Sequence, residues 1–368
     1  MTARDTQACH QRSTAATALS VGRTLSFITT DECSAACAHC LMQSGPDRSA
    51  KLSFAQIRDR IDEIALTGDY ALVVFTGGEC TRLGDDLLDA IAYANVHGLI
   101  TRAVTNSEWA TTAEAAEKMI GNLREAGLQE LNLSYDDFHR VWIPEANLLR
   151  AWEASKNRGF DSVVLALASG PRSRVTPAWL CELVGEDLPL AYDLVDGLRQ
   201  PLPEPSADGT QYLISNSHLV RLGRGRGLRD DYATFPDHQE SVMLQSCPPS
   251  NREPVITPRD HVSACCGVNP DGNRVLDFGE GSDGPTEFQH VVLGALHYLG
   301  PGHLLRMAQD GGGGLRARER YASICEMCDD VTRDAAAMAF LSDNIERLAE
   351  DVNAAAAITA VATAQGEN

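Results

Sequence analysis

Three cysteines stand close together near the start of the chain, at Cys33, Cys37 and Cys40, separated by three and then two residues. Thiolates are the ligands of iron–sulfur clusters, and a [4Fe–4S] cluster normally takes four of them. Because the next cysteine is far away, the spacing indicates a cluster with one iron left open for a substrate or cofactor. A structural zinc site is the alternative. It needs four ligands, and His39 lies between two cysteines, where one tetrahedral metal could hardly collect all four.

A loop after a strand must hold these cysteines, since the apolar run Leu25–Thr30 comes directly before them. A helix is expected over Leu52–Leu66, where Ser53 and Gln56 form a capping box, followed by a buried strand over Tyr70–Thr76. This alternation continues and predicts an α/β fold with a parallel sheet, either a partial barrel or an open doubly wound sheet. Further strands are expected over Leu99–Thr105, Leu128–Ser134, Ser162–Ala168 and Gln211–Ser217, and further helices over Thr111–Gly127, Pro144–Arg158 and Pro177–Val184.

The strand over Tyr70–Thr76 ends in Gly77, Gly78 and Glu79. Two glycines let the backbone approach a ligand closely, and a carboxylate can pair with an ammonium group. Together with the cysteine spacing, this segment resembles the radical S-adenosylmethionine (SAM) superfamily, over about residues 25–330. The resemblance implies a partial (β/α)6 TIM-type barrel whose [4Fe–4S] cluster cleaves SAM to a 5′-deoxyadenosyl radical, which abstracts a hydrogen from the substrate.

The resemblance also implies which residues bind SAM. Gly77, Gly78 and Glu79 would contact its methionine amino group, and His39 would pack near its adenine. Ser134 and Asp136 would contact the ribose, although Asp136 has the alternative of capping a turn or helix.

Three more residues are candidates by position. Asn106 follows the strand over Leu99–Thr105, and Arg224 lies in a glycine-rich stretch, LVRLGRGRGL, that resembles the family's segment along the cofactor. The alternative for Arg224 is a solvated basic turn. Cys80 is a tentative hydrogen donor to a substrate radical, and its alternative is a small buried side chain.

A second group of cysteines lies in the last third of the chain. Cys247 and Cys265 are separated by seventeen residues, and Cys325 and Cys328 form a CxxC pair. Four thiolates can hold a complete cluster, and the region resembles the twitch or SPASM extension of radical SAM enzymes. The resemblance implies one auxiliary [4Fe–4S] cluster, with Cys266 as the alternative ligand to Cys265. A zinc ribbon on the same cysteines is the competing interpretation.

These patterns predict four regions. We expect a disordered tail over residues 1–24, the barrel over 25–235, a twitch-like iron–sulfur extension over 236–335, and a C-terminal helix and tail over 336–368. The Pro-rich residues 185–210 are expected to form an insertion, either a hairpin or a loop facing the substrate.

Composition limits the location and the partners. The net charge of −20 disfavours nucleic acid as a partner. The chain has no run of eighteen apolar residues, so no membrane segment is expected, and its start lacks the apolar core of a signal peptide. We therefore expect a cytoplasmic protein. Its eleven cysteines, an odd number, then favour metal ligation over disulfides.

The substrate is the least determined property. The resemblance favours a peptide that is oxidised, cross-linked or epimerised in the maturation of a ribosomal natural product. A small-molecule dehydrogenase, acting on an aminocyclitol or sugar alcohol, is the alternative. A non-catalytic zinc-binding interaction protein is disfavoured because it leaves Gly77–Glu79 unexplained. We expect flavodoxin or ferredoxin as electron donor and, because only 24 residues precede Leu25, a separate leader-binding protein for a peptide substrate.

Overall fold

The computed structural model describes residues 23–191, 194–195, 198–199, 204–247, 253–265, 267, 273, 275–280, 285–312 and 315–366. Its centre is a parallel sheet in which neighbouring strands follow one another along the chain, in the order β1-β2-β3-β4-β5-β8. The strands are β1 (Arg23–Ile28), β2 (Tyr70–Thr76), β3 (Ile100–Thr105), β4 (Glu130–Ser134), β5 (Ser162–Ser169) and β8 (Gln211–His218).

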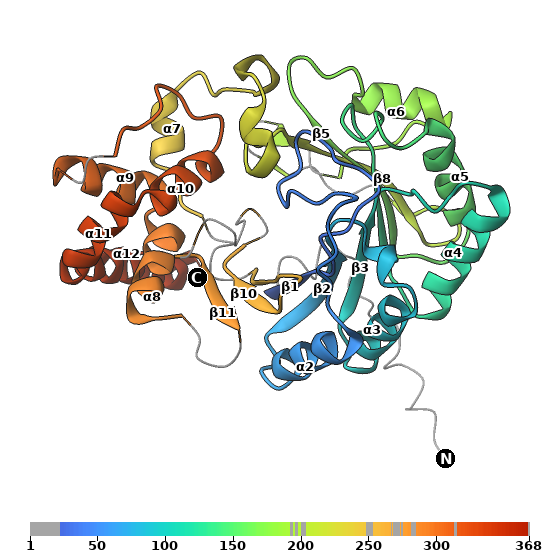
Figure 1. Ribbon diagram of the computed structural model, residues 1–368, viewed down its shortest axis with the longest axis horizontal. Coiled ribbons are helices and arrows are strands. Elements are labelled where there is room, and N and C mark those ends of the chain that lie inside the picture. Colours follow the sequence, from blue (N-terminus) through green and yellow to red (C-terminus); the bar gives the residue numbers. More distant parts are fainter. Residues whose placement is uncertain are drawn as a thin grey trace.

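This strand order distinguishes the two topologies that the sequence left open. A doubly wound sheet reverses its order near the middle, whereas this one runs in a single direction. Helices α2–α6 lie along the outer side of the sheet, as Figure 1 shows. The predicted partial (β/α)6 barrel is therefore confirmed. The helices are α2 (Phe54–Ala65), α3 (Asp85–Val96), α4 (Ala113–Glu125), α5 (Glu145–Ser155) and α6 (Pro177–Val184).

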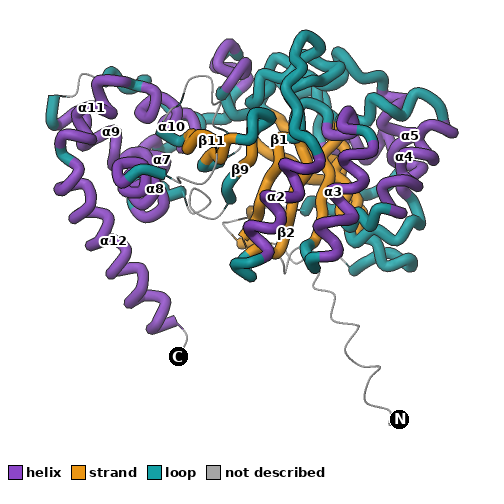
Figure 2. The backbone as a smooth tube through the Cα atoms, turned by 60° about the horizontal axis from the view of Figure 1, so that its bottom comes forward, coloured by secondary structure: helices purple, strands orange, loops and turns teal. Residues whose placement is uncertain are grey.

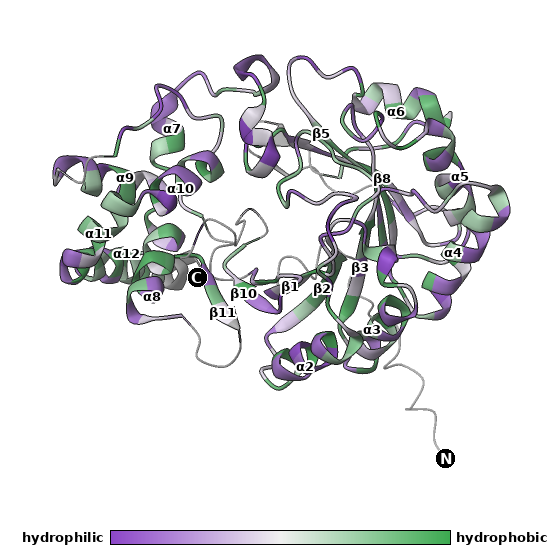
Figure 3. Cartoon of the chain, in the orientation of Figure 1, coloured by the Kyte–Doolittle hydropathy of each residue, from purple (hydrophilic) through white to green (hydrophobic). Residues whose placement is uncertain are grey.

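Alternating side chains of the strands build the barrel core. On β2, Val73 and Phe75 are completely buried and belong to the same apolar cluster as Ile57 and Ile61 of α2. Apolar strands covered by helices with polar outer sides are visible in Figure 3. This layer arrangement brings the carboxyl ends of all six parallel strands to one rim, where the loops that carry the candidate residues begin.

Local signals placed most helices to within a few residues. Ser53 and Gln56 form the predicted capping box at α2. The cap of α4 is Thr112, whose side chain accepts from the Ala115 amide, and not Thr111 as predicted. Strand β1 begins at Arg23, inside the segment expected to be a disordered tail; residues 1–22 lie outside the described residues. Part of the Pro-rich insertion forms the predicted hairpin, in which β6 (Leu194–Val195) pairs antiparallel with β7 (Leu198–Arg199).

The C-terminal half extends the same sheet. Strand β9 (Val255–Ile256) pairs in parallel with β1, and β10 (His261–Ser263) and β11 (Asp277–Glu280) follow antiparallel. A separate apolar core includes residues from Ala264 to Leu348. The helices of this half are α7 (Gln239–Met243), α8 (Glu287–Tyr298), α9 (Pro301–Asp310), α10 (Ile324–Arg333), α11 (Ala335–Asp343) and α12 (Ile345–Gly366).

The terminal helices are part of this second core. Met338 and Leu341 of α11 and Leu348 of α12 are buried in it, so the packing shows no boundary at the expected position near residue 335. Helix α12 then continues away from the body, as Figure 2 shows. Among the described helices, none combines the length and apolar character needed to cross a membrane.

Candidate active site

The loop after β1 brings the first three cysteines together. Cys33 and Cys37 are buried in one small apolar cluster, against which Cys40 and Phe138 pack. The Cys33 sulfur accepts two N–H groups at 3.4 Å, from the Ala35 backbone and the Asn106 side chain. Such donors stabilise a sulfur that carries negative charge, as a metal-bound thiolate does.

The protonation of these thiols fits a metal-loaded site. Burial raises the pKa of Cys33 to about 11 and raises that of Cys37 further, with added repulsion from neighbouring acidic groups that include Cys40. The free loop therefore holds neutral thiols, whereas a metal deprotonates coordinating thiols outright. Loading of the site must release protons.

The spacing of the sulfurs separates a cluster from zinc. In the described part of the chain, the metal-binding side chains that gather within 4.8 Å of one another are His39, Asp136 and His139, and no cysteine is among them. Four sulfurs on one zinc ion lie within about 4 Å of one another, because each Zn–S bond is about 2.3 Å. Wider spacing suits a cubane cluster, in which each cysteine binds a different iron.

Gly77 and Gly78 let β2 end directly against the cysteine loop. The Gly78 amide donates to the Thr30 carbonyl at 2.7 Å, and Gly77 has a φ of 144°. A Cβ at Gly77 would lie 2.7 Å from the Thr30 oxygen, and one at Gly78 would overlap the Glu32 carbonyl. Close backbone approach explains both glycines.

The carboxylate of Glu79 has a different role from the predicted amine contact. It is completely buried and accepts hydrogen bonds from the Thr105 hydroxyl at 2.7 Å, the Asn106 amide at 2.8 Å, and the Thr81 amide and hydroxyl. Burial raises its pKa, and these hydrogen bonds counteract the rise. Glu79 therefore joins the ends of β2 and β3, and both oxygens of its buried carboxylate already accept hydrogen bonds from the protein.

Arg224 also differs from its predicted role. Its Nε donates to the Cys37 carbonyl at 2.9 Å and its backbone amide to the Cys40 carbonyl at 3.1 Å; a further guanidinium N–H donates to the Ser44 carbonyl. Arg224 is thus neither a solvated turn residue nor free to meet a cofactor carboxylate. It holds the cysteine loop in place.

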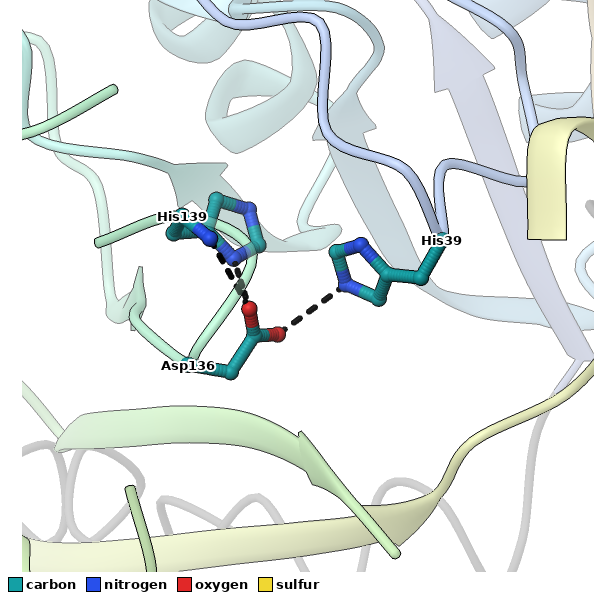
Figure 4. A group of neighbouring side chains, drawn as sticks. All are labelled: His39, Asp136 and His139. Atoms are coloured by element: carbon teal, nitrogen blue, oxygen red, sulfur yellow. Dashed lines mark hydrogen bonds and ion pairs between the residues drawn. The ribbon is translucent and has the colours of Figure 1, made fainter. Parts of the chain in front are cut away.

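Asp136 is the centre of a charged group formed by the loops after β1 and β4 (Figure 4). One oxygen lies 3.0 Å from His39 Nε2, and the other lies 2.9 Å from His139 Nδ1 and accepts the Phe138 and His139 amides. Burial alone would raise the pKa of Asp136, but the charge and hydrogen bonds of the two histidines hold it well below its usual value. At these distances the carboxylate forms an ion pair with each imidazole ring that is protonated. Asp136 also caps its turn, which was the predicted alternative.

An apolar face lies beside this charged group. The His39 ring stacks on Phe138 with centroids 4.6 Å apart and an angle of 16° between the planes. Ser134, the last residue of β4, is half-buried near the same rim.

Cys80 lies outside this site. It has no exposed surface, belongs to the barrel core, and donates its S–H to the Val104 carbonyl at 3.3 Å. The structure therefore favours the alternative interpretation, a small buried side chain, over a hydrogen donor.

The second group of cysteines also converges. Burial, followed by the negative charge of Cys265, Cys325 and Cys247, raises the pKa of Cys328 far above its usual value. Cys265, Cys325 and Cys247 therefore each lie near Cys328; Cys266 lies outside the described residues.

Two residues at these sites were missed by sequence reasoning. His139 completes the charged group, and Glu326, on the helix that carries Cys325 and Cys328, forms a buried pair with Arg221. The DxxH spacing of Asp136 and His139 gave a weak signal for the first. No local signal connects Arg221 with Glu326, which is 105 residues away.

Known proteins that resemble this chain identify its family. The family model described as "Radical SAM superfamily" matches residues 27–171. The GTP 3′,8-cyclase of Vibrio vulnificus strain YJ016 is 33% identical over 242 residues, covering 58% of this chain and 68% of that protein. Among solved structures, BtrN with AdoMet and 2-DOIA shares 13% identity, covering 77% of this chain and 89% of BtrN, with a TM-score of 0.46. The structure of anSMEcpe with AdoMet and the Cp18Cys peptide shares 12% identity, covering 90% of this chain and 99% of anSMEcpe, with a TM-score of 0.46. The chain belongs to the radical SAM superfamily, which implies a [4Fe–4S] cluster and SAM as its cofactors.

Proposed function

We propose that this chain cleaves SAM at a [4Fe–4S] cluster held by Cys33, Cys37 and Cys40, and uses the product to oxidise or otherwise modify a peptide. The observation that carries the proposal is the convergence of two buried thiols, Cys33 and Cys37, and the half-buried Cys40 in one cluster in the loop after β1, with two N–H donors on Cys33. When bound, the cluster supplies an electron that releases a 5′-deoxyadenosyl radical from SAM.

The protein's own groups position the cofactor and exclude water. The backbone of Gly77 and Gly78 borders the cysteine loop, where it can approach the methionine part of SAM. The stacked rings of His39 and Phe138 offer an apolar face for adenine, and Ser134 offers a hydroxyl for the ribose, while Asp136 holds His39 in position. Asn106 stays beside Cys33.

A second cluster is proposed on Cys247, Cys265, Cys325 and Cys328, within a twitch-like extension over residues 236–335. The support is that Cys325 and Cys328 lie on one helix, α10, with Cys247 and Cys265 near Cys328. Four cysteines complete the ligand set of a [4Fe–4S] cluster. A complete cluster has no open iron, so its role is to accept or supply an electron during a net oxidation.

A peptide is the proposed substrate because two apolar side chains are exposed beside the site. Val141 and Trp142 come two and three residues after His139, in the loop after β4, and are 76% and 44% exposed. Apolar side chains of a peptide can cover them. The small-molecule alternative has its own support. The side-chain oxygen Oδ1 of Asn132, on β4, is buried and has no hydrogen-bond partner. A hydroxyl of a sugar alcohol or aminocyclitol could donate to this oxygen.

Anaerobic reconstitution with iron and sulfide tests the proposal. We expect about eight irons per chain, and release of 5′-deoxyadenosine from SAM with dithionite or reduced flavodoxin. A Cys33→Ala/Cys37→Ala/Cys40→Ala variant should keep about four irons per chain. It should release no 5′-deoxyadenosine. Cys181→Ala, a cysteine outside both groups, is the matched control and should behave as the unaltered chain. Stoichiometric zinc without 5′-deoxyadenosine would contradict the proposal.

Substrate class is tested by the increase in 5′-deoxyadenosine that candidate substrates cause. Short peptides, an aminocyclitol and GTP, the last because of the matched cyclase, are the arms of this test. We expect stimulation by peptides, and loss of most of that stimulation in Trp142→Ala at unchanged substrate-free turnover. Stimulation by the aminocyclitol alone would favour the alternative.

A further inference from the structure

One short segment touches both groups of cysteines. It runs from Leu219 to Leu228, directly after β8, and includes the short helix η2 (Gly223–Gly227). We call it the bridging segment. Its sequence, LVRLGRGRGL, alternates apolar residues, glycines and arginines, and the two sides of the segment make different contacts.

One side of the bridging segment packs on the first cysteine loop. Gly223 has a φ of 54°, and a Cβ there would lie 2.6 Å from the Cys40 carbonyl oxygen and would overlap that of Leu41. Arg224 donates to the carbonyls of Cys37 and Cys40. A side chain at Gly225 would likewise meet the His39 backbone at 3.3 Å. Because the two backbones approach this closely, the bridging segment has little room to move relative to the cysteine loop.

The other side binds helix α10, which carries Cys325 and Cys328. Arg221 donates from Nε and a terminal nitrogen to the two oxygens of Glu326, at 2.8 and 2.9 Å, and its backbone amide also points to Glu326 at 3.3 Å. Glu326 lies between the two cysteines. The side chains are 6% and 0% exposed, and a buried two-point pair of this kind fixes distance and orientation together.

The same segment also lies near Gly267, two residues after Cys265. A Cβ at Gly267 would lie 3.1 Å from Leu222 Cδ1 and 3.7 Å from the Cys265 sulfur. Arg221 and Arg224 are three positions apart; Arg221 binds the helix that carries Cys325 and Cys328, and Arg224 binds the loop that carries Cys37 and Cys40. The backbone between the two contacts is therefore very short.

We propose that the bridging segment sets the separation and orientation of the two cysteine groups, and that Arg221, acting through Glu326, is a positioning residue for the pair. The inference rests on the proposed second cluster. The rate of electron transfer between two metal centres falls steeply as their separation grows. An element that fixes this separation therefore sets the rate of transfer between them.

Dipolar electron paramagnetic resonance of the doubly reduced holoenzyme tests the proposal, because the coupling between two spins falls with the cube of their separation. The unaltered chain should give one narrow coupling. Arg221→Lys keeps the charge but cannot make the two-point contact, and it should broaden that coupling and shift it to lower frequency at unchanged iron content. Arg224→Lys, at the other contact, should do the same.

Arg102→Lys is the matched control. Arg102 of β3 pairs with the buried carboxylate of Glu130 on β4, within the barrel sheet and outside the bridging segment. Its coupling should equal that of the unaltered chain. An unchanged coupling in both Arg221→Lys and Arg224→Lys would overturn the proposal.

Failure of the proposed function would look different. The unaltered chain would then hold only about four irons and show one cluster signal, which would overturn the second cluster and the bridging role together. If the chain holds about eight irons but the dipolar coupling is unchanged in Arg221→Lys and Arg224→Lys, only the bridging role is overturned.

Discussion

At the scale of single residues, burial separates the candidates that can contact a cofactor or substrate from those that stabilise the fold around the site. Glu79 and Cys80 both lie in sequence beside the family motif, yet neither has exposed surface. Hydrogen bonds occupy the carboxylate of Glu79, and the thiol of Cys80 donates to Val104. Their types and positions were visible in the sequence, but the direction of each side chain depends on contacts with β3 and its end, about 25 residues later.

Cys80→Ala tests this distinction. We expect the free energy of unfolding to fall by about 1–2 kcal/mol, because a buried hydrogen bond and its packing are lost, while 5′-deoxyadenosine release stays unchanged. Urea unfolding of the metal-free chain and a product assay measure the two effects. Cys181→Ala, a half-buried cysteine of the same helical layer, is the comparison. Normal 5′-deoxyadenosine release with loss of the modified product would instead restore Cys80 as a hydrogen donor.

The pair of Asp136 and His139 predicts a pH dependence of stability. The pKa of Asp136 is lowered, so its contribution is complete above about pH 3.8, the ordinary value, and is lost as the pH falls through the lower folded value. Burial opposes protonation of His139, but Asp136 raises its pKa above 6.5. The contribution of His139 is therefore complete below pH 6.5 and is lost as the pH rises through its folded pKa.

His139→Gln should accordingly be less stable than the unaltered chain at pH 5–6.5, by roughly 1–3 kcal/mol, and the difference should shrink at alkaline pH. Denaturant unfolding of the metal-free chain across this range measures it. His97→Gln removes a more exposed histidine that lies 3.6 Å from Asp62 and should change little. A difference that grows above pH 7 would contradict the assignment.

At the scale of elements, the sequence predicted what depends on nearby residues. The capping box at α2 and the positions of the six parallel strands followed from caps and apolar runs. Strands β9–β11 were missed because they are two to four residues long and have no readable period. The bridging segment was noticed for its glycines, but its contacts with Cys40 and Glu326 join residues far apart in the sequence, which no local pattern encodes.

Gly223→Ala tests how closely the bridging segment fits the cysteine loop. The new Cβ would meet the carbonyls of Cys40 and Leu41 and would need a positive φ, so we expect a loss of roughly 1–3 kcal/mol and less iron in the first site. Gly227→Ala is the matched control, because it lies in the same short helix with nothing within 4 Å of a Cβ. Equal iron content and stability in both variants would show that the fit is loose.

At the scale of the whole molecule, two cores share one sheet. The barrel core lies under α2–α6, and the second core joins α8 to α11 and α12. Gly294 of α8 allows α12 to approach, since a Cβ there would lie 2.8 Å from Val352 Cγ1.

Gly294→Leu should therefore separate α12 from α8 and lower the thermal stability of the second core, with loss of iron from the second site only. Gly121→Leu is the control, because Gly121 lies in α4 with nothing within 4 Å of a Cβ. Thermal unfolding followed with iron analysis measures both. Loss of iron from both sites in Gly294→Leu would mean that the two cores unfold as one unit.

The extension of the sheet by β9–β11 has a consequence for how a polypeptide could dock. Strand addition needs an edge with unpaired backbone groups. At β1 that edge is taken by β9, and at β8 the Ile214 amide and carbonyl already bond to Pro189 and Ala191. Among the described strands of this sheet, the outermost backbone on the C-terminal side is that of β11. A peptide that added a strand at β11 would therefore lie beside the half of the molecule that carries the second cysteine group.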